Sequence, residues 1–541
     1  MIKVFTAGGS DPFRLGGSRG RLAVVLGLCV AFPLFSESAS GQAANAGGAV
    51  QKPGAAEPSK DAAAKKDEDE KAADAPVLDP SETQQGVAVE LFLDPNAAAL
   101  MDLKNFKPIR VSHDATNSEF DQFKRMAADP LVQPDQAVII AVVDSMIAKL
   151  TNPKNIEAVL DVSGAGANAA ASKAIQDATK TLIEPIFQAR AVKNTQFQTV
   201  YNRVLAQKLP PVLKNHLIPR IQAMIVLGES GSLDAYKTFL DEIKDPTQTV
   251  WVKHWAFKGL SNIKEHTNKL SATQEADAAK LIADQLVKNE EWPWPVQFRA
   301  LETLATLRQG YSPTSARTAD MAAAAFQYLT NGDLDLEVRA EAALALGFMQ
   351  ITSVVPKYNN TVIAYATAEL AAEIGDRIAE RFTENKLRAQ KYTTVLMKPI
   401  LQTYEGRPGF RESGLLNSPV TANKADIQKY DDAIRPVVKA AIDLVGGPVG
   451  QVKANLEALK ARIAVLKAFL DKNPPPTREL FQGGPQLPEP AAPVAAEPKA
   501  APAEPKAAQP APETAKAPQP AAEKAKSDRP RVSSGRSRGK Q

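Results

Sequence analysis

The sequence predicts an all-α protein built largely from stacked helical hairpins. Hydrophobic residues recur with helical spacing from Gly86 to about Lys472, and no long alternating strand pattern competes with them. Aromatic residues make up 6% of the chain and alanine is abundant, which suits closely packed helices better than a β-sandwich. A ten-residue motif also occurs four times between residues 219 and 347. Together these observations favour a helical repeat architecture.

Residues 1–43 resemble a secretory signal peptide. The apolar run LAVVLGLCVAFPLF at 22–35 is followed by the small residues SASGQAANA, so we expect the mature chain to begin between 40 and 47. The run is shorter than the ~20 residues that span a bilayer, so we expect no membrane span after its removal. The alternative is a lipoprotein signal ending at Cys29, the only cysteine, although the bulky Leu28 does not fit that processing site. The basic residues before the run are Lys3, Arg14, Arg19 and Arg21.

Residues 44–85 are rich in Ala, Lys, Asp and Glu and offer little to bury, which predicts a disordered linker. Residues 86–422 are predicted to form the helical repeat domain, with clear helices at 135–150 and 361–382. The segment VAVELFL at 87–93 is the one candidate strand. Regular structure should therefore begin only near residue 86.

The repeated motif places small and large apolar residues at fixed positions. Its copies are PRIQAMIVLG from 219, VKHWAFKGLS from 252, VQFRALETLA from 296 and VRAEAALALG from 338. The fifth and ninth positions, four apart, share one helix face. The fifth residues are Ala223, Ala256, Ala300 and Ala342, and the ninth are Leu227, Leu260, Leu304 and Leu346. Alanine lets helices approach closely while leucine fills the same face one turn further.

This motif resembles the second helix of the HEAT family, which often opens with Val-Arg after an Asp-containing turn. The resemblance covers residues 219–347 and implies an α-solenoid in which the Arg and a turn Asp form polar contacts between neighbouring repeats. In the third copy Gln297 takes the place of the basic residue, and Pro219 replaces the valine of the first. The ladder residues that the resemblance implies are Arg220, Lys253, Arg339, Asp245 and Asp333.

Residues 423–472 carry two helical stripes separated by GGPVG at 446–450, which predicts an antiparallel helical hairpin kinked at Pro436. Solenoid ends need capping units, so we expect this hairpin to close the stack; a dimerisation arm is the alternative. The first stripe comprises Ile427, Tyr430, Ile434, Val437, Ala441 and Leu444, and the second comprises Val452, Leu456, Leu459, Ile463, Leu466 and Leu470.

Residues 473–541 are rich in Pro and Ala and are predicted to form a disordered, extended tail. Its end, from Lys524 to Gln541, carries a net charge of +6, because seven basic residues accompany the single acidic Asp528. Such an end can bind an anionic polymer, or it can simply keep the chain soluble. The basic residues are Lys524, Lys526, Arg529, Arg531, Arg536, Arg538 and Lys540.

Motifs for catalysis and cofactors find little support. The four histidines have no metal-ligand spacing, so we expect no metal site, and GESGS at 228–232 lacks the last glycine of a nucleophile elbow. Gly164, Gly166 and Ala169 fit a dinucleotide-binding pattern, but helical sequence surrounds them where strands are required. We therefore expect no cofactor.

All four tryptophans, Trp251, Trp255, Trp292 and Trp294, fall within 44 residues of adjacent repeats, so their rings could meet. They can fill a wide gap between repeats. Alternatively, together with Lys253 and Lys258, they form an exposed aromatic ledge that grips a peptide or a sugar.

We therefore expect an exported, non-enzymatic α-solenoid scaffold that binds protein or peptide partners in the periplasm, cell envelope or extracellular space. A structural envelope component whose basic tail binds anionic polymer is the alternative. A third hypothesis, a helical enzyme using acids such as Glu229 or Asp241, lacks a recognisable site. The formal charge of +4 gives no whole-protein field that favours nucleic acid.

The tail hypothesis predicts that truncation after Ala522 abolishes retention of the protein on an anionic matrix at low salt. Retention of the full-length chain should fall steeply with salt, because charge is the tail's main asset. Helical content and melting temperature should not change. Equal retention of both proteins would leave the tail a solubilising spacer.

Overall fold

The computed structural model describes residues 95–489, apart from 112, 161–168, 268, 313–317, 411 and 421–422. Its regular structure is helical, with two isolated β-bridges in the described part, so the all-α class is confirmed. The signal segment, the linker 44–85, the strand predicted at 87–93 and the basic residues of the tail lie outside the described residues.

The α-helices in the order of the chain are α2 (Pro95–Leu100), α3 (Asn117–Ala128), α4 (Gln136–Leu150), α5 (Pro153–Leu160), α6 (Ala169–Ala191), α7 (Thr195–Lys208), α8 (Leu217–Ser230), α9 (Tyr236–Lys244), α10 (Val250–Asn262), α11 (Ala272–Lys288), α12 (Trp294–Leu307), α13 (Asp320–Thr330), α14 (Leu336–Phe348), α15 (Asn360–Arg381), α16 (Lys386–Val395), α17 (Leu401–Glu405), α18 (Lys424–Gly446) and α19 (Val452–Lys472). Two π-helical turns follow α10 and α16: η4 (Ile263–Thr267) and η6 (Leu396–Ile400). The short 3₁₀ turns are η1 (Leu103–Asn105), η2 (Pro210–Lys214), η3 (Leu233–Ala235), η7 (Leu415–Asn417) and η8 (Val449–Gln451).

Polar caps set the starts of several helices. Thr116 and Glu119 form a capping box at α3, and Ser271 and Gln274 form another at α11. Thr249 accepts a hydrogen bond from the Val252 N–H and so caps α10. The helices predicted at 135–150 and 361–382 correspond to α4 and α15 within one residue at each end.

The repeated motif has the same position in each of its four helices. It begins at the third residue of α8, α10, α12 and α14, which are Pro219, Val252, Val296 and Val338. The alanines at its fifth position are all fully buried, and the leucines at its ninth position are buried as well. The four copies therefore present equivalent faces to their neighbours.

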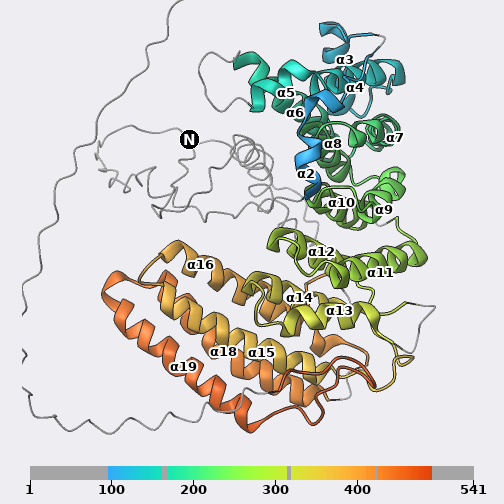
Figure 1. The fold of residues 1–541 in the computed structure, drawn as a ribbon. Coiled ribbons are helices and arrows are strands. Elements are labelled where there is room, and N and C mark those ends of the chain that lie inside the picture. Colours follow the sequence, from blue (N-terminus) through green and yellow to red (C-terminus); the bar gives the residue numbers. More distant parts are fainter. Residues whose placement is uncertain are drawn as a thin grey trace, which may run out of the picture. The chain divides into compact units, whose positions relative to one another are not determined.

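Each helix that carries the motif packs on the next one. α8 contacts α10, α10 contacts α12, and α12 contacts α14, while α11 packs on both α9 and α13 in a second row. Figure 1 shows these helices in that succession, coloured from green to yellow. Two rows of helices sharing a core is the packing expected of stacked hairpins; a continuous solenoid over 86–422 and membership of the HEAT family stay predictions.

The tenth position of the motif is small in every copy, which adds to the pattern predicted from the fifth and ninth positions. A Cβ on Gly228 would lie 3.0 Å from the Trp255 carbonyl oxygen of α10. A Cβ on Gly347 would lie 2.6 Å from the Thr403 carbonyl oxygen of α17. The other two tenth residues are Ser261 and Ala305. Small side chains here allow the backbones of neighbouring helices to approach closely.

The predicted hairpin at 423–472 is present as α18 and α19. The two helices pack on each other and both pack on α15, and the capping role stays a prediction. The first predicted stripe is buried, and so are the last four residues of the second, whereas Val452 and Leu456 are only partly buried. α18 continues as a helix through Pro436. A dimerisation role remains untested.

The prediction that the disordered tail begins at residue 473 is wrong for its first part. Leu480, Phe481 and Leu487 are buried, and the Asn359 N–H donates to the Leu480 carbonyl at 2.8 Å. Residues 474–488 thus form an ordered strap against the start of α15. The sequence PPPTRELFQGGPQLP has a linker-like proline content, but it also contains three large apolar residues that find a core. The chain's internal contacts accordingly divide after Pro488.

Among the described residues, no helix combines the length and hydropathy required to cross a membrane.

The shared register predicts a specific sensitivity to overpacking. Ala342→Leu should lower the free energy of unfolding by about 1–3 kcal/mol, because this fully buried residue has no room for added methyl groups. Ala454→Leu, on the exposed side of α19, is the matched control and should melt like the wild type. Thermal unfolding followed by circular dichroism measures both, and an unchanged melting temperature for Ala342→Leu would contradict the register.

Candidate functional site

The second position of the motif holds a buried polar side chain in every copy. Arg220, Lys253, Gln297 and Arg339 are between 3% and 8% exposed. A buried cation is costly unless its polar atoms find partners. The contacts of these four residues therefore show how neighbouring repeats are joined.

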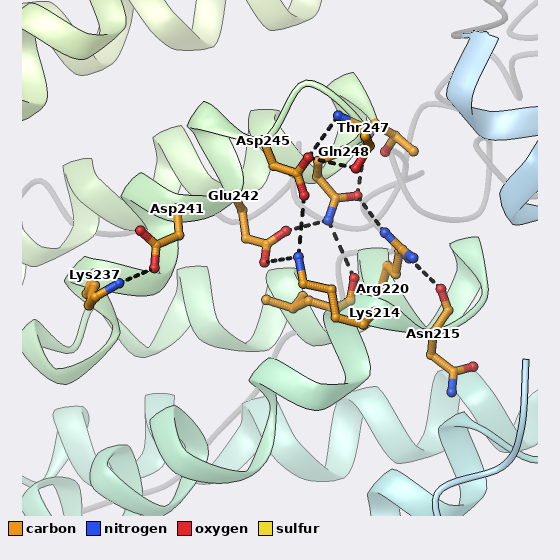
Figure 2. Close-up of polar contacts among 11 residues, drawn as sticks. Lys214, Asn215, Arg220, Lys237, Asp241, Glu242, Asp245, Thr247 and Gln248 are labelled. Atoms are coloured by element: carbon orange, nitrogen blue, oxygen red, sulfur yellow. Dashed lines mark hydrogen bonds and ion pairs between the residues drawn. The ribbon is translucent and has the colours of Figure 1, made fainter.

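Arg220 connects α8 to the turn of the following repeat. Its Nε donates to the Asn215 carbonyl, and its Nη1 donates to Oε1 of Gln248 at 3.3 Å. Gln248 in turn donates to the carboxylate of Glu242 on α9. Figure 2 shows this chain of contacts running from the start of α8 to the turn between α9 and α10. All the groups involved are buried or part-buried.

The HEAT resemblance implies that basic residues of the motif contact turn aspartates, but the hydrogen bonds of Arg220 go to Asn215 and Gln248 and not to Asp245. Asp245 instead accepts from the backbone N–H and the hydroxyl of Thr247 at 2.8 and 2.6 Å, and it lies 3.4 Å from Nζ of Lys214. The same Lys214 contacts Glu242 at 3.1 Å. Asp245 thus shapes the turn, while the buried Gln248 receives the arginine (Figure 2).

Arg339 makes an equivalent connection with different partners. Its Nε donates to the Leu329 carbonyl of α13 at 3.1 Å, and its Nη1 lies 2.6 Å from Oε2 of Glu373 on α15. Asp333, the other implied ladder aspartate, lies in the turn, where its N–H donates to the Asn331 side chain. Arg339 therefore reaches the next helix of the chain, as expected of a ladder residue, through an acid that the sequence did not indicate.

The two middle copies use still other contacts. Nζ of Lys253 lies 5.9 Å from the ring centroid of Trp292, in the turn that precedes α12. Gln297, which interrupts the basic pattern, donates to the Glu290 carbonyl at 2.7 Å. The motif therefore keeps a polar group at this position, while the partner changes from one repeat to the next.

The exposed aromatic ledge is wrong for three of the four tryptophans. Trp251, Trp255 and Trp292 are only 5–6% exposed. Trp255 packs on the glycine at the end of α8, and the Trp292 ring centroid lies 6.0 Å from that of Phe257 on α10. Turn residue Trp292 thus contacts the preceding repeat, as a gap-filling role predicts. Lys258 is half-buried on α10.

Trp294 differs, because its ring is only partly buried. Nζ of Lys391, on α16, lies 5.1 Å from the Trp294 ring centroid and 2.8 Å from Oε1 of Glu337 on α14. The Lys391 side chain is 53% exposed. We call Lys253, His254, Trp292, Trp294 and Lys391 the aromatic–cation junction. The junction is the part of the predicted site that keeps an accessible aromatic ring. Lys391 was not predicted from the sequence because it lies 97 residues after Trp294 in the chain.

His254, a member of the junction, links α10 to α12 through a backbone contact. Its Nδ1 lies 3.2 Å from the Pro295 carbonyl oxygen, which can only accept, so Nδ1 carries the hydrogen. Burial, with the nearby positive charges of Arg299 and Lys258, lowers the pKa of His254 to about 3. The imidazole is therefore neutral at ordinary pH and joins α10 to the first turn of α12.

The other sequence candidates have ordinary surroundings. The glycine-rich segment follows α5 and precedes α6, and its residues 161–168 lie outside the described part. Because the residues before it are helical, they do not form the strand that dinucleotide binding requires. Asp241 pairs with Lys237 at 2.5 Å on α9 (Figure 2), and the Glu229 backbone carbonyl accepts from Arg190. Within residues 95–489, where described, no cluster of His, Cys, Asp and Glu is suited to a metal ion.

No protein-family model, no curated protein and no solved structure matches this chain.

The low pKa of His254 predicts a pH-dependent stability. The unfolded chain binds a proton near pH 6.5, but the folded chain does so only near pH 3, so stability is fully present above about pH 6.5 and falls as the pH approaches 3. His254→Gln, whose amide can donate to the same carbonyl, should reduce the loss of melting temperature between about pH 7 and about pH 4.5. An unchanged loss in the variant would show that His254 is not a source of this dependence.

Proposed function

We propose that this chain is an exported, non-enzymatic helical scaffold that binds a protein or peptide partner at the aromatic–cation junction. The observation that carries the proposal is the half-buried ring of Trp294 beneath the exposed Lys391, on a stack of helices joined by buried polar contacts. Tryptophan held by rigid neighbours is a frequent anchor of protein interfaces. The export component rests on the N-terminal segment and not on the described helices.

The junction is well suited to a peptide with an acidic side chain next to an apolar one. Lys391 is already paired with Glu337, so an incoming carboxylate can replace or share that partner. The exposed part of the Trp294 ring can cover an apolar side chain of the same peptide. α12 begins at this tryptophan and has Pro293 at its cap and Pro295 in its first turn, so the ring is held at the end of a well-defined helix.

Site-specific photocross-linking tests the proposal directly. A photoreactive phenylalanine analogue at Trp294 should give discrete adducts in the native cell-envelope fraction, which mass spectrometry can identify. The same group at Val287, an exposed residue of α11, is the matched control. The same weak smear of products from both positions would contradict a partner site at the junction.

Once a partner is identified, Trp294→Ala should weaken its binding at least tenfold, because interface tryptophans commonly contribute about 2 kcal/mol or more. Lys391→Gln should weaken it less, since the lysine is largely exposed and a solvated charge contributes little. Isothermal calorimetry measures both variants beside Val287→Ala. Equal affinities of Trp294→Ala and wild type would exclude this ring as the anchor.

A further inference from the structure

One element of the fold combines several cations with exposed apolar side chains. α16 and η6 together form Lys386–Ile400, which contains four basic residues and no acidic one. Their inner side packs on the body, because Ala389, Tyr392, Thr393, Leu396 and Ile400 are buried. The basic residues are Lys386, Arg388, Lys391 and Lys398.

The outer side of this element is apolar as well as basic. Leu387 is 63% exposed and Met397 is 46% exposed. The π-helical turn around Pro399 alters the helical progression at the end of the element, and Met397 and Lys398 are both exposed there. Leu387, Met397 and the four basic residues are all exposed on this element, and we call these six side chains the α16 face.

The charge of the α16 face is only partly compensated. Lys391 pairs with Glu337, and Glu384, at the end of the preceding connection, pairs with Arg381. Within the described residues, the side chains of Lys386 and Lys398 form no ion pair. Two lysines without an ion pair therefore accompany the exposed leucine and methionine.

We propose that the α16 face binds the surface of a bilayer that contains anionic lipid. Basic residues near such a surface are attracted to its negative potential, and apolar side chains among them can enter the boundary between headgroups and acyl chains. A soluble polyanion would use the cations but gains nothing from Leu387 and Met397. The exposed apolar pair is therefore the feature that favours a lipid surface over a polymer.

The helix does not have to leave the protein to make this contact. α16 is held by α14, α15 and α18, so its outer side is presented by a folded body. The attachment is thus peripheral and reversible, and its strength should decrease with ionic strength.

Vesicle sedimentation tests the proposal. The probes are vesicles of phosphatidylcholine alone and vesicles with a third of phosphatidylglycerol, with soluble dextran sulfate as the polymer control. Full-length protein is used, both unchanged and with the seven basic residues of 524–540 replaced by glutamine, so that the tail cannot conceal the effect. Exposed positions are altered throughout, and each variant's melting temperature is checked against the wild type.

Lys386→Gln with Lys398→Gln should reduce partitioning onto anionic vesicles about thirtyfold. Leu387→Ser with Met397→Ser should reduce it severalfold without changing the binding of dextran sulfate. The matched controls lie on α19: Lys453→Gln with Lys472→Gln for charge, and Val465→Ser, which is 63% exposed like Leu387, for the apolar pair. These controls should bind vesicles like the wild type.

Three results would overturn the proposal. The first is equal binding of the protein to anionic and to neutral vesicles, whether or not the tail charges are present. The second is vesicle binding that both α16 variants retain in full. In the third, Leu387→Ser with Met397→Ser has no effect, whereas Lys386→Gln with Lys398→Gln weakens the binding of vesicles and of dextran sulfate equally. This result would identify a polyanion site instead.

Discussion

The close contact between successive motif helices is the constraint on which the rest of this structure depends. The alanines at the fifth position are fully buried where α8, α10, α12 and α14 pack on one another, and the glycines at the tenth position let the backbone of α8 approach α10 and that of α14 approach α17. Packing this tight excludes water from the adjoining positions. Any polar side chain that the motif places there must then find a partner within the protein, because an unpaired buried group is costly.

The second position of the motif illustrates this consequence. Arg220 finds a carbonyl and an amide, Lys253 an indole ring, Gln297 a carbonyl, and Arg339 a carbonyl and a carboxylate. Among these contacts the ion pair is that of Arg339 with Glu373, whose side chain is 42% exposed, so the contacts common to the four residues are the ones that satisfy their buried polar atoms. Satisfying the polar group, and not any one ion pair, is thus the requirement common to all four repeats.

Local pattern was sufficient to predict α4, α15, the equivalence of the four motifs and the hairpin of α18 and α19, because helical periodicity and turn residues are short-range signals. It did not predict Glu373 or Lys391, since each partner lies in another helix and repeats at no fixed interval. Nor could it decide the exposure of Trp292, which depends on Phe257 and Lys253 of the preceding repeat. The strap at 474–488 was not predicted because its proline content resembles that of the tail beyond it. Its three large apolar side chains are nevertheless buried against the helical body.

The end of the repeated pattern also explains where accessible groups occur. In the middle of the row, each motif helix has another on both sides, and Trp251 and Trp255 of α10 are buried accordingly. After α14 the pattern stops: α15 is covered by α18 and α19, and α16 packs on α14, α15 and α18. The partly exposed Trp294 meets α16 through Lys391 at this boundary. The tryptophan that stays partly exposed thus lies where a helix from outside the repeated pattern approaches a motif helix.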